Sequence, residues 1–414
     1  MDVKFSRMDK KIGGTTCVYW RAGRCNRNPC KFLHRETSSL HVNARSKYCG
    51  KKSHSSSNNT SKYNPKKKLV RKRGDGTNVV KVSKKSSTSI CKYWTNNNCV
   101  YGEQCPHLHS WFQGDGFSTL KKLHQHKKAI TGITLLAGTN KLYYGSTDGT
   151  VRIWDCHTGQ CLKVLNFGTQ VNSLISEGPW VFVGLNNVIK ALNTKTNLEF
   201  TLDGPKGRIL HMTVGNNILF AGAEDGVITA WRESSEVKSP FELVASLTGH
   251  TKSVVCLTIG RKMLYSGSMD QSIKVWDMDT LQCTMTLNEH NDVVTSLICW
   301  DEFLLSSSSD GTIKIWACME EGTLTVLYTH IEQSGIVSLF GMPNAKGKPI
   351  LFSSCKDNSV RMYELPSFSE RGLLYAKKDI ASFELGHDGL FFTGDDTGLL
   401  RVWKWNELPK MTSD

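Results

Sequence analysis

Short apolar segments alternate with polar turns through most of the chain. Between residues 117 and 405, runs of β-branched and aromatic residues are separated by Asp-Gly or Asp-polar turns, which is typical of tight hairpins between antiparallel strands. A unit that ends in an apolar-aromatic strand recurs seven times, as TVRIWD, NVIKALN, VITAWR, SIKVWD, TIKIWA, SVRMYE and LLRVWKW. At about 41 residues per unit, the repeat predicts an all-β fold of small four-stranded sheets.

The fourth and fifth units carry the clearest family likeness. GHTKSVVCLTIGRKMLYSGSMDQSIKVWD, from Gly249, and EHNDVVTSLICWDEFLLSSSSDGTIKIWA, from Glu289, resemble WD repeats. The resemblance implies a seven-bladed WD-repeat β-propeller over residues 117–405, with a buried hydrogen-bonded tetrad in each well-matched blade. The matching tetrads are His250, Ser266, Asp270 and Trp276, and His290, Ser306, Asp310 and Trp316. Because such sets recur with the repeat, we interpret them as structural and not as a hydrolase triad.

Other units depart from this tetrad. The first has Tyr144 in place of Ser, and the second and sixth end in Leu192 and Tyr363 in place of Trp. The seventh has Thr397 at the Asp position, and we expect all these units to be less rigid. Because the seventh unit stops after its third strand, residues 117–123 are predicted to supply the closing outer strand of the last blade.

The excess of positive over negative charge is confined to the N-terminal part of the chain. The 414 residues carry a net charge of +15, with 24 Lys+Arg against 6 Asp+Glu up to residue 120 and 28 against 31 after it. Residues 37–88 are rich in Ser, Asn and Lys and predict a disordered basic linker. Its run KKKLVRKR at residues 66–73 favours nuclear import, nucleic-acid contact or both, and a solvated tail without a partner is the alternative.

Two cysteine and histidine clusters flank the linker, within residues 13–36 and 89–111. Both have nearly the same spacing, C-x7-C-x4-C-x3-H and C-x7-C-x5-C-x3-H. Three thiolates and one imidazole complete a tetrahedral zinc site without an open position, so the clusters predict two structural Zn²⁺ ions and no metal catalysis. The predicted ligands are Cys17, Cys25, Cys30 and His34, and Cys91, Cys99, Cys105 and His109. Each module is too small for its own core, so metal binding would supply its folding free energy.

The spacing resembles that of CCCH zinc fingers, a family that largely binds single-stranded RNA. Aromatic and cationic residues between the ligands suit base stacking and phosphate contact, and the candidate nucleic-acid contacts are Tyr19, Trp20, Arg24, Arg27, Lys31, Phe32, Tyr93, Trp94 and Tyr101. Some of these rings could instead form a miniature core around the metal. Where the first finger has Phe32, the second has His107, which could compete with His109 for zinc.

The whole arrangement resembles the plant zinc-finger CCCH proteins with WD repeats. The resemblance implies a nuclear adaptor. Its fingers would bind nucleic acid, with RNA preferred over DNA, and its propeller would bind a protein. A propeller-centred scaffold, or a substrate receptor of a ubiquitin ligase with the basic arm used for localisation, is the alternative. No apolar stretch is long enough for a membrane span, and the N-terminus has no apolar signal region, so we expect a nuclear or cytoplasmic protein without disulfides. Neither an enzyme activity nor a small-molecule substrate is expected, since no phosphate-cradling loop or open metal site is present.

Overall fold

The structure is a computed structural model that describes residues 90–405, except residues 97, 115, 235–239, 320–321 and 344–347. The predicted first finger and basic linker therefore lie outside the described residues. The chain divides into two compact units between His109 and Ser110, and each unit is treated separately below. The smaller described part, from residue 90 to 109, contains helix α2 (Lys92–Thr95) and the 3-10 turn η1 (Gly102–Gln104).

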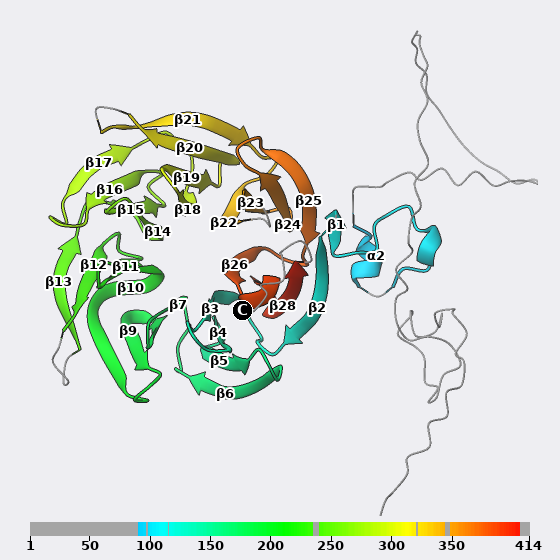
Figure 1. The fold of residues 1–414 in the computed structure, drawn as a ribbon, viewed down its shortest axis with the longest axis horizontal. Coiled ribbons are helices and arrows are strands. Elements are labelled where there is room, and N and C mark those ends of the chain that lie inside the picture. The colour runs from blue at the N-terminus through cyan, green and yellow to red at the C-terminus, as the bar shows by residue number, and fades with distance from the viewer. Residues whose placement is uncertain are drawn as a thin grey trace, which may run out of the picture. The chain divides into compact units, whose positions relative to one another are not determined.

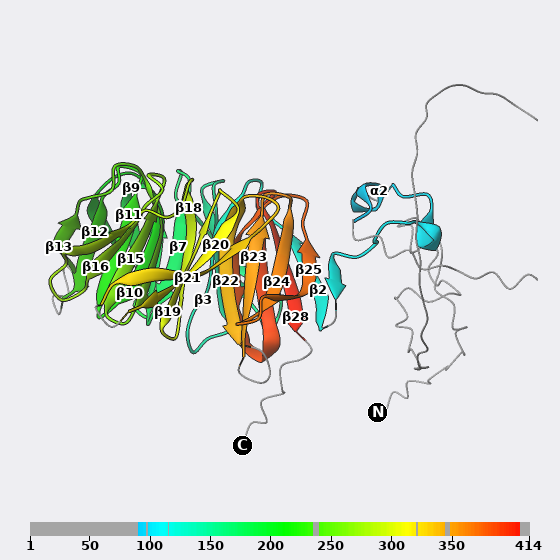
Figure 2. The ribbon, with the colours of Figure 1, turned by 90° about the horizontal axis from the view of Figure 1, so that it is seen from above.

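Antiparallel sheets follow one another around a ring in the larger unit (Figure 1), and Figure 2 shows the ring from the side. One sheet contains β3 (Ile130–Leu135), β4 (Lys141–Ser146), β5 (Thr150–Asp155) and β6 (Gln160–Asn166). Two further sheets contain β14 (Val254–Gly260), β15 (Met263–Ser268), β16 (Ile273–Asp277) and β17 (Cys283–Leu287), and β18 (Val294–Trp300), β19 (Phe303–Ser308), β20 (Thr312–Cys318) and β21 (Leu324–Ile331). The predicted all-β propeller fold is confirmed.

A single long strand, β10 (Glu199–Gly215), belongs to two neighbouring units. Its first part pairs with β9 and its second part with β11, so that the two four-stranded units form one seven-stranded sheet. The other strands of this sheet are β7 (Ser173–Glu177), β8 (Trp180–Gly184), β9 (Asn186–Asn193), β11 (Ile218–Ala223), β12 (Ile228–Glu233) and β13 (Phe241–Leu247). The sequence periodicity did not predict this shared strand.

The last sheet combines strands from both ends of the larger unit. It contains β26 (Ile380–Leu385), β27 (Leu390–Asp395), β28 (Leu399–Trp405) and β2 (Phe117–His124), with the short turn η2 (His387–Gly389) between β26 and β27. Strand β2 pairs with β28 and sets Phe117 opposite Trp405. The predicted closing strand at residues 117–123 thus lies beside the third strand of the seventh unit.

One additional strand lies before the region in which the repeat was predicted to begin. The sixth unit contains β22 (Ile336–Pro343), β23 (Pro349–Cys355), β24 (Ser359–Glu364) and β25 (Ser369–Tyr375). Strand β1 (Phe112–Gly114) pairs with the outer strand β25 and adds a fifth strand to this sheet. The segment just after the second cysteine cluster is therefore part of the propeller.

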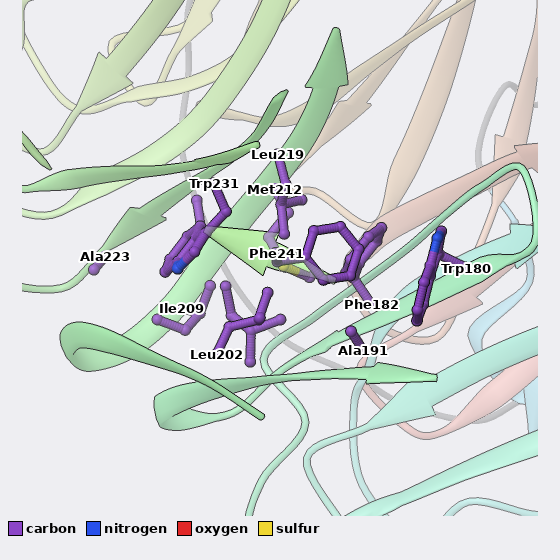
Figure 3. Close-up of a cluster of buried hydrophobic side chains, with 12 residues drawn as sticks. Trp180, Phe182, Ala191, Leu202, Ile209, Met212, Leu219, Ala223, Trp231 and Phe241 are labelled. Atoms are coloured by element: carbon purple, nitrogen blue, oxygen red, sulfur yellow. The ribbon is translucent and has the colours of Figure 1, made fainter. Parts of the chain in front are cut away.

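Apolar side chains are buried between neighbouring strands and sheets. The second strand of each unit is buried on both faces, as in β11, where all six residues are buried. Figure 3 shows one such cluster, in which Phe182 from β8 and Phe241 from β13 meet edge to face with ring centroids 5.4 Å apart. Small residues allow the sheets to approach closely, since a Cβ added at Gly267 would lie 2.6 Å from Val294 Cγ1. Each buried large side chain contributes about 1.5–3 kcal/mol.

The fourth unit brings its predicted tetrad together. The Nδ1–H of His250 donates to Asp270 Oδ2 over 2.8 Å. Burial lowers the pKa of His250, so the ring is neutral at pH 7 and its Nε2 accepts from Ser266 Oγ–H, also over 2.8 Å. The indole N–H of Trp276 donates to Ser266 Oγ over 2.8 Å. The fifth unit has the same network, formed by His290, Ser306, Asp310 and Trp316.

In the divergent units, other residues supply the hydrogen-bond partners that the serine supplies in the tetrad. In the first unit Gln125 Oε1 accepts from both Tyr144 Oη and Trp154 Nε1 over 3.3 Å, which replaces the missing serine. In the seventh unit, Trp403 Nε1 donates to Thr393 Oγ1 over 3.0 Å. Thr397 contacts Asp395, two residues before the usual Asp position.

Replacement of the central serine should destabilise the propeller. Ser266→Ala removes a fully buried hydroxyl and leaves the Trp276 N–H without an acceptor, so we expect the free energy of unfolding to fall by about 1–3 kcal/mol. Urea denaturation followed by tryptophan fluorescence measures this change. Ser246→Ala, at an exposed serine on β13, is the matched control. Equal stability of the two variants would contradict the structural role of the tetrad.

Candidate metal centre

The second cysteine cluster begins where a short helix starts. Cys91 is the N-cap of α2, and its Sγ accepts a hydrogen bond from the backbone N–H of Trp94 over 3.3 Å. Ile90 and Leu108 form a parallel bridge, and Cys91 N–H donates to the carbonyl of Leu108 over 2.9 Å. These contacts bring the two ends of the module together, so that its first and last predicted ligands become neighbours.

The four predicted ligands of the second finger converge. One ligand atom from each of Cys91, Cys99, Cys105 and His109 lies within 4.8 Å of the others. In tetrahedral zinc–thiolate sites the bond length of about 2.3 Å sets sulfur atoms somewhat under 4 Å apart, so a modest contraction would suit the ion. Nε2 of His109 is buried and has no hydrogen-bond partner in the part of the chain that the structure describes, as expected for a nitrogen whose partner is a metal. The donor set and its spacing therefore fit zinc.

The surroundings shift the pKa values of the ligands in different directions, and burial raises the pKa of the Cys105 thiol. Burial raises the pKa of the Cys91 thiol, but the hydrogen bond from Trp94 N–H and the neighbouring thiols Cys105 and Cys99 leave it below its ordinary value. Burial and the nearby His107 lower the pKa of His109. The lowered pKa values of Cys91 and His109 shift these two groups toward the thiolate and the neutral imidazole, which are the forms that bind zinc.

The aromatic residues of this finger separate into two groups. Trp94 is half-buried and stacks on His109 with ring centroids 5.6 Å apart and planes inclined by 12°. It therefore belongs to the miniature core around the ligands. Tyr93 and Tyr101 are 65 % and 63 % exposed, and Val100 beside Tyr101 is 87 % exposed. Two rings of the predicted nucleic-acid contacts are thus available at the surface of the finger.

His107 does not belong to the group of converging ligand atoms, and its side chain is exposed. The last ligand of the group is His109, two residues further along the chain. The remaining predicted site residues lie outside the described residues: Cys17, Tyr19, Trp20, Arg24, Cys25, Arg27, Cys30, Lys31, Phe32 and His34. In the part of the chain that the structure describes, no helix is long and apolar enough to cross a membrane.

The fold and the cysteine–histidine centre together define a CCCH zinc-finger protein with a WD40 propeller. The family model "WD domain, G-beta repeat" matches residues 117–155, 241–277 and 281–317. The chain belongs to the family of zinc finger CCCH domain-containing proteins, as its similarity to curated relatives shows. This combination of modules supports a protein that binds nucleic acid, other proteins or both.

The similarity extends over nearly the whole chain. Zinc finger CCCH domain-containing protein 17 of Oryza sativa subsp. japonica is 46 % identical over 402 residues, which cover 95 % of this chain and 91 % of the relative. Zinc finger CCCH domain-containing protein 48 of Arabidopsis thaliana is 48 % identical over 408 residues, which cover 94 % and 91 %. The crystal structure of the WD40 beta propeller domain of Doa1 has the same fold, with a TM-score of 0.60, 23 % identity, and coverage of 70 % of this chain and 97 % of that one.

Loss of one ligand should remove one metal ion. We expect the full-length wild-type protein to carry two zinc ions per chain and Cys105→Ser to carry one fewer, because a thiolate of the second site is lost. Metal analysis after gel filtration measures the ratio. The unfolding midpoint of the propeller should not change, since Cys105 belongs to the other compact unit. Cys283→Ser, at an exposed cysteine on β17, is the control, and equal zinc content in the two variants would contradict this metal site.

Proposed function

We propose that the protein is a nuclear, non-catalytic adaptor that binds single-stranded RNA through its fingers and recruits a protein partner through its propeller. The observation that carries the RNA proposal is the exposure of Tyr93 and Tyr101 beside the converging zinc ligands. A module organised by zinc holds such rings in place at little entropic cost on binding. Each base stacked on an aromatic ring contributes about 1–3 kcal/mol.

The charge distribution supports a polyanionic ligand. The first 120 residues hold 24 of the 52 Lys and Arg but only 6 of the 37 Asp and Glu. Such a segment attracts phosphate backbones over distances of about 10 Å at moderate salt. Charge alone does not select a base or a sugar, so exposed rings that stack on unpaired bases favour a single strand, and RNA is the proposed ligand.

The propeller offers a separate surface for a protein partner. Its outer strand β21 exposes Leu327, Tyr328 and Ile331, at 65 %, 46 % and 76 %. Exposed aliphatic and aromatic side chains of this kind are enriched at the centres of protein interfaces. The rigid sheets beneath them provide a fixed surface, which supports recruitment of a protein while the fingers hold RNA.

Removal of the two exposed rings should weaken RNA binding without changing its electrostatic part. For Tyr93→Ala with Tyr101→Ala we expect the Kd for a short single-stranded RNA to rise by about 5- to 150-fold per stacked base. Fluorescence anisotropy of the zinc-loaded, full-length protein measures Kd at several salt concentrations. The salt slope should not change, because the substitutions remove no charge.

Val100→Ala is the matched control, since it truncates an exposed apolar side chain of the same finger that has no ring. It should bind RNA as the wild type does. An unchanged Kd in the double tyrosine variant would reduce the arm to a basic tether and favour a propeller-centred scaffold.

A further inference from the structure

A buried arginine in the seventh unit lacks, among the described residues, the two acidic partners that the matching arginine of the sixth unit has. Arg401, on β28, is only 2 % exposed, and it remains charged at pH 7 even though burial lowers its pKa to about 10. Its Nη1 donates to the carbonyl of Tyr375 over 2.6 Å. Nε and Nη2 are buried and have no hydrogen-bond partner among the described residues. An uncompensated buried charge is costly, so its retention calls for a physical reason.

The preceding unit shows how an arginine at this position can be neutralised, whereas Arg152 at the matching position of the first unit donates to the neutral Gln125 Oε1. Arg361, on β24, lies two residues before Tyr363, just as Arg401 lies two residues before Trp403, the residue at the tetrad Trp position. Its Nη2 lies 2.8 Å from Asp357 Oδ2, and its Nη1 lies 3.3 Å from Glu332 Oε2. Two carboxylates therefore compensate one guanidinium in the sixth unit.

Both of these acidic positions are neutral in the seventh unit. Thr397 precedes Arg401 by four residues, just as Asp357 precedes Arg361. Ala376 precedes the start of β26 by four residues, just as Glu332 precedes the start of β22. Asp395 is close enough to act electrostatically on Arg401, but its Oδ1 accepts hydrogen bonds from Thr397 and Leu399 instead.

Two lysines add further positive charge at the same place. Lys122, on β2, is the register partner of Arg401, and its Nζ lies 5.1 Å from the centroid of the Trp111 ring. The guanidinium carbon of Arg401 lies 4.1 Å from the centroid of that same ring. Lys377 lies two residues after Tyr375, whose carbonyl accepts the hydrogen bond from Arg401. Partial desolvation and the charges of Arg401 and Lys377 lower the pKa of Lys122. Lys122 and Lys377 are both exposed.

We propose that Lys122 and Lys377, supported by Arg401 beneath Trp111, form an anion site on the propeller that takes a phosphodiester group of the bound single strand. The two exposed lysines contact the phosphate oxygens. Arg401 is a positioning residue, since it holds the indole in place and adds charge from a low-dielectric environment where its field is poorly screened. This inference rests on the proposed RNA-binding function.

Chain connectivity favours a nucleic acid over an acidic peptide as the occupant. Only Ser110 separates the zinc ligand His109 from Trp111. The connection is therefore only two residues long, at most about 7 Å between the Cα atoms of His109 and Trp111. A strand bound to the finger is tethered to the same chain that carries the propeller cations, which raises its effective concentration at them.

The test compares two double variants of the full-length, zinc-loaded protein. Lys122→Gln with Lys377→Gln removes two charges from the proposed site, and Lys163→Gln with Lys195→Gln removes two from exposed positions of the first two units. Binding of a short single-stranded RNA is measured by anisotropy across a salt series. We expect only the first variant to bind more weakly at low salt, with a salt slope shallower by about 0.7 for each lost phosphate contact.

Four results would overturn the proposal, and they are distinguishable. An unchanged Kd and slope in Lys122→Gln with Lys377→Gln, together with weaker binding in the Tyr93 and Tyr101 variant, would remove the phosphate site and leave the proposed function intact. Equal weakening of RNA binding in both double lysine variants would show that these lysines act only through the general electrostatic field of the protein. If Lys122→Gln with Lys377→Gln weakens the binding of a polyglutamate peptide as much as the binding of RNA, the occupant would be an acidic protein. A wild-type protein that does not bind RNA would overturn both proposals.

Discussion

The propeller depends on one constraint, which is that the polar side chains buried within its sheets must find partners there. In every unit except the second, which has Leu192, the third strand brings an indole or a phenol into the sheet. Leaving such a buried polar group without a hydrogen bond is costly. Ser266 satisfies the constraint in the fourth unit, Gln125 in the first and Glu332 in the sixth, where its Oε1 accepts from Tyr363 Oη over 2.8 Å. The sheets are thus held to a common geometry by different side chains.

The finger meets the same problem of stability by other means. Among its described residues only Cys91 is both apolar and buried, so its four-residue helix has no core of its own on which to pack. Isolated helices of that length do not persist in water. The geometry of Cys91, Cys99, Cys105 and His109 shows where the missing free energy enters, since a structural zinc ion contributes about 10–16 kcal/mol of apparent binding free energy.

Repetition and ligand spacing made much of the molecule predictable from the sequence. Recurring apolar strands specify antiparallel sheets, and the C-x7-C-x5-C-x3-H spacing selects residues that converge in space. The residues that replace the tetrad serine were not predictable from the sequence. Gln125 and Glu332 stand at positions where the well-matched units have other residues, and their longer side chains accept the hydrogen bonds of the buried site. Strand β1 was also missed, since three residues carry too little periodicity to be recognised as a strand. The distinction between Trp94 and Tyr93 depends on which ring packs on His109, and sequence spacing does not determine that.

The seventh unit differs from the others because it is made from both ends of the propeller. Its third strand carries Arg401, and the strand that pairs with it carries Lys122 from the opposite end of the repeat region. Charges that are far apart in the sequence therefore become neighbours only when β2 and β28 pair. Their mutual repulsion opposes that pairing, and the burial of Phe117 and Trp405, whose stacked rings have centroids 5.2 Å apart, acts in the other direction. An anion that neutralises the cations would bind the folded propeller and not the unfolded chain, so it would stabilise the pairing of β2 with β28.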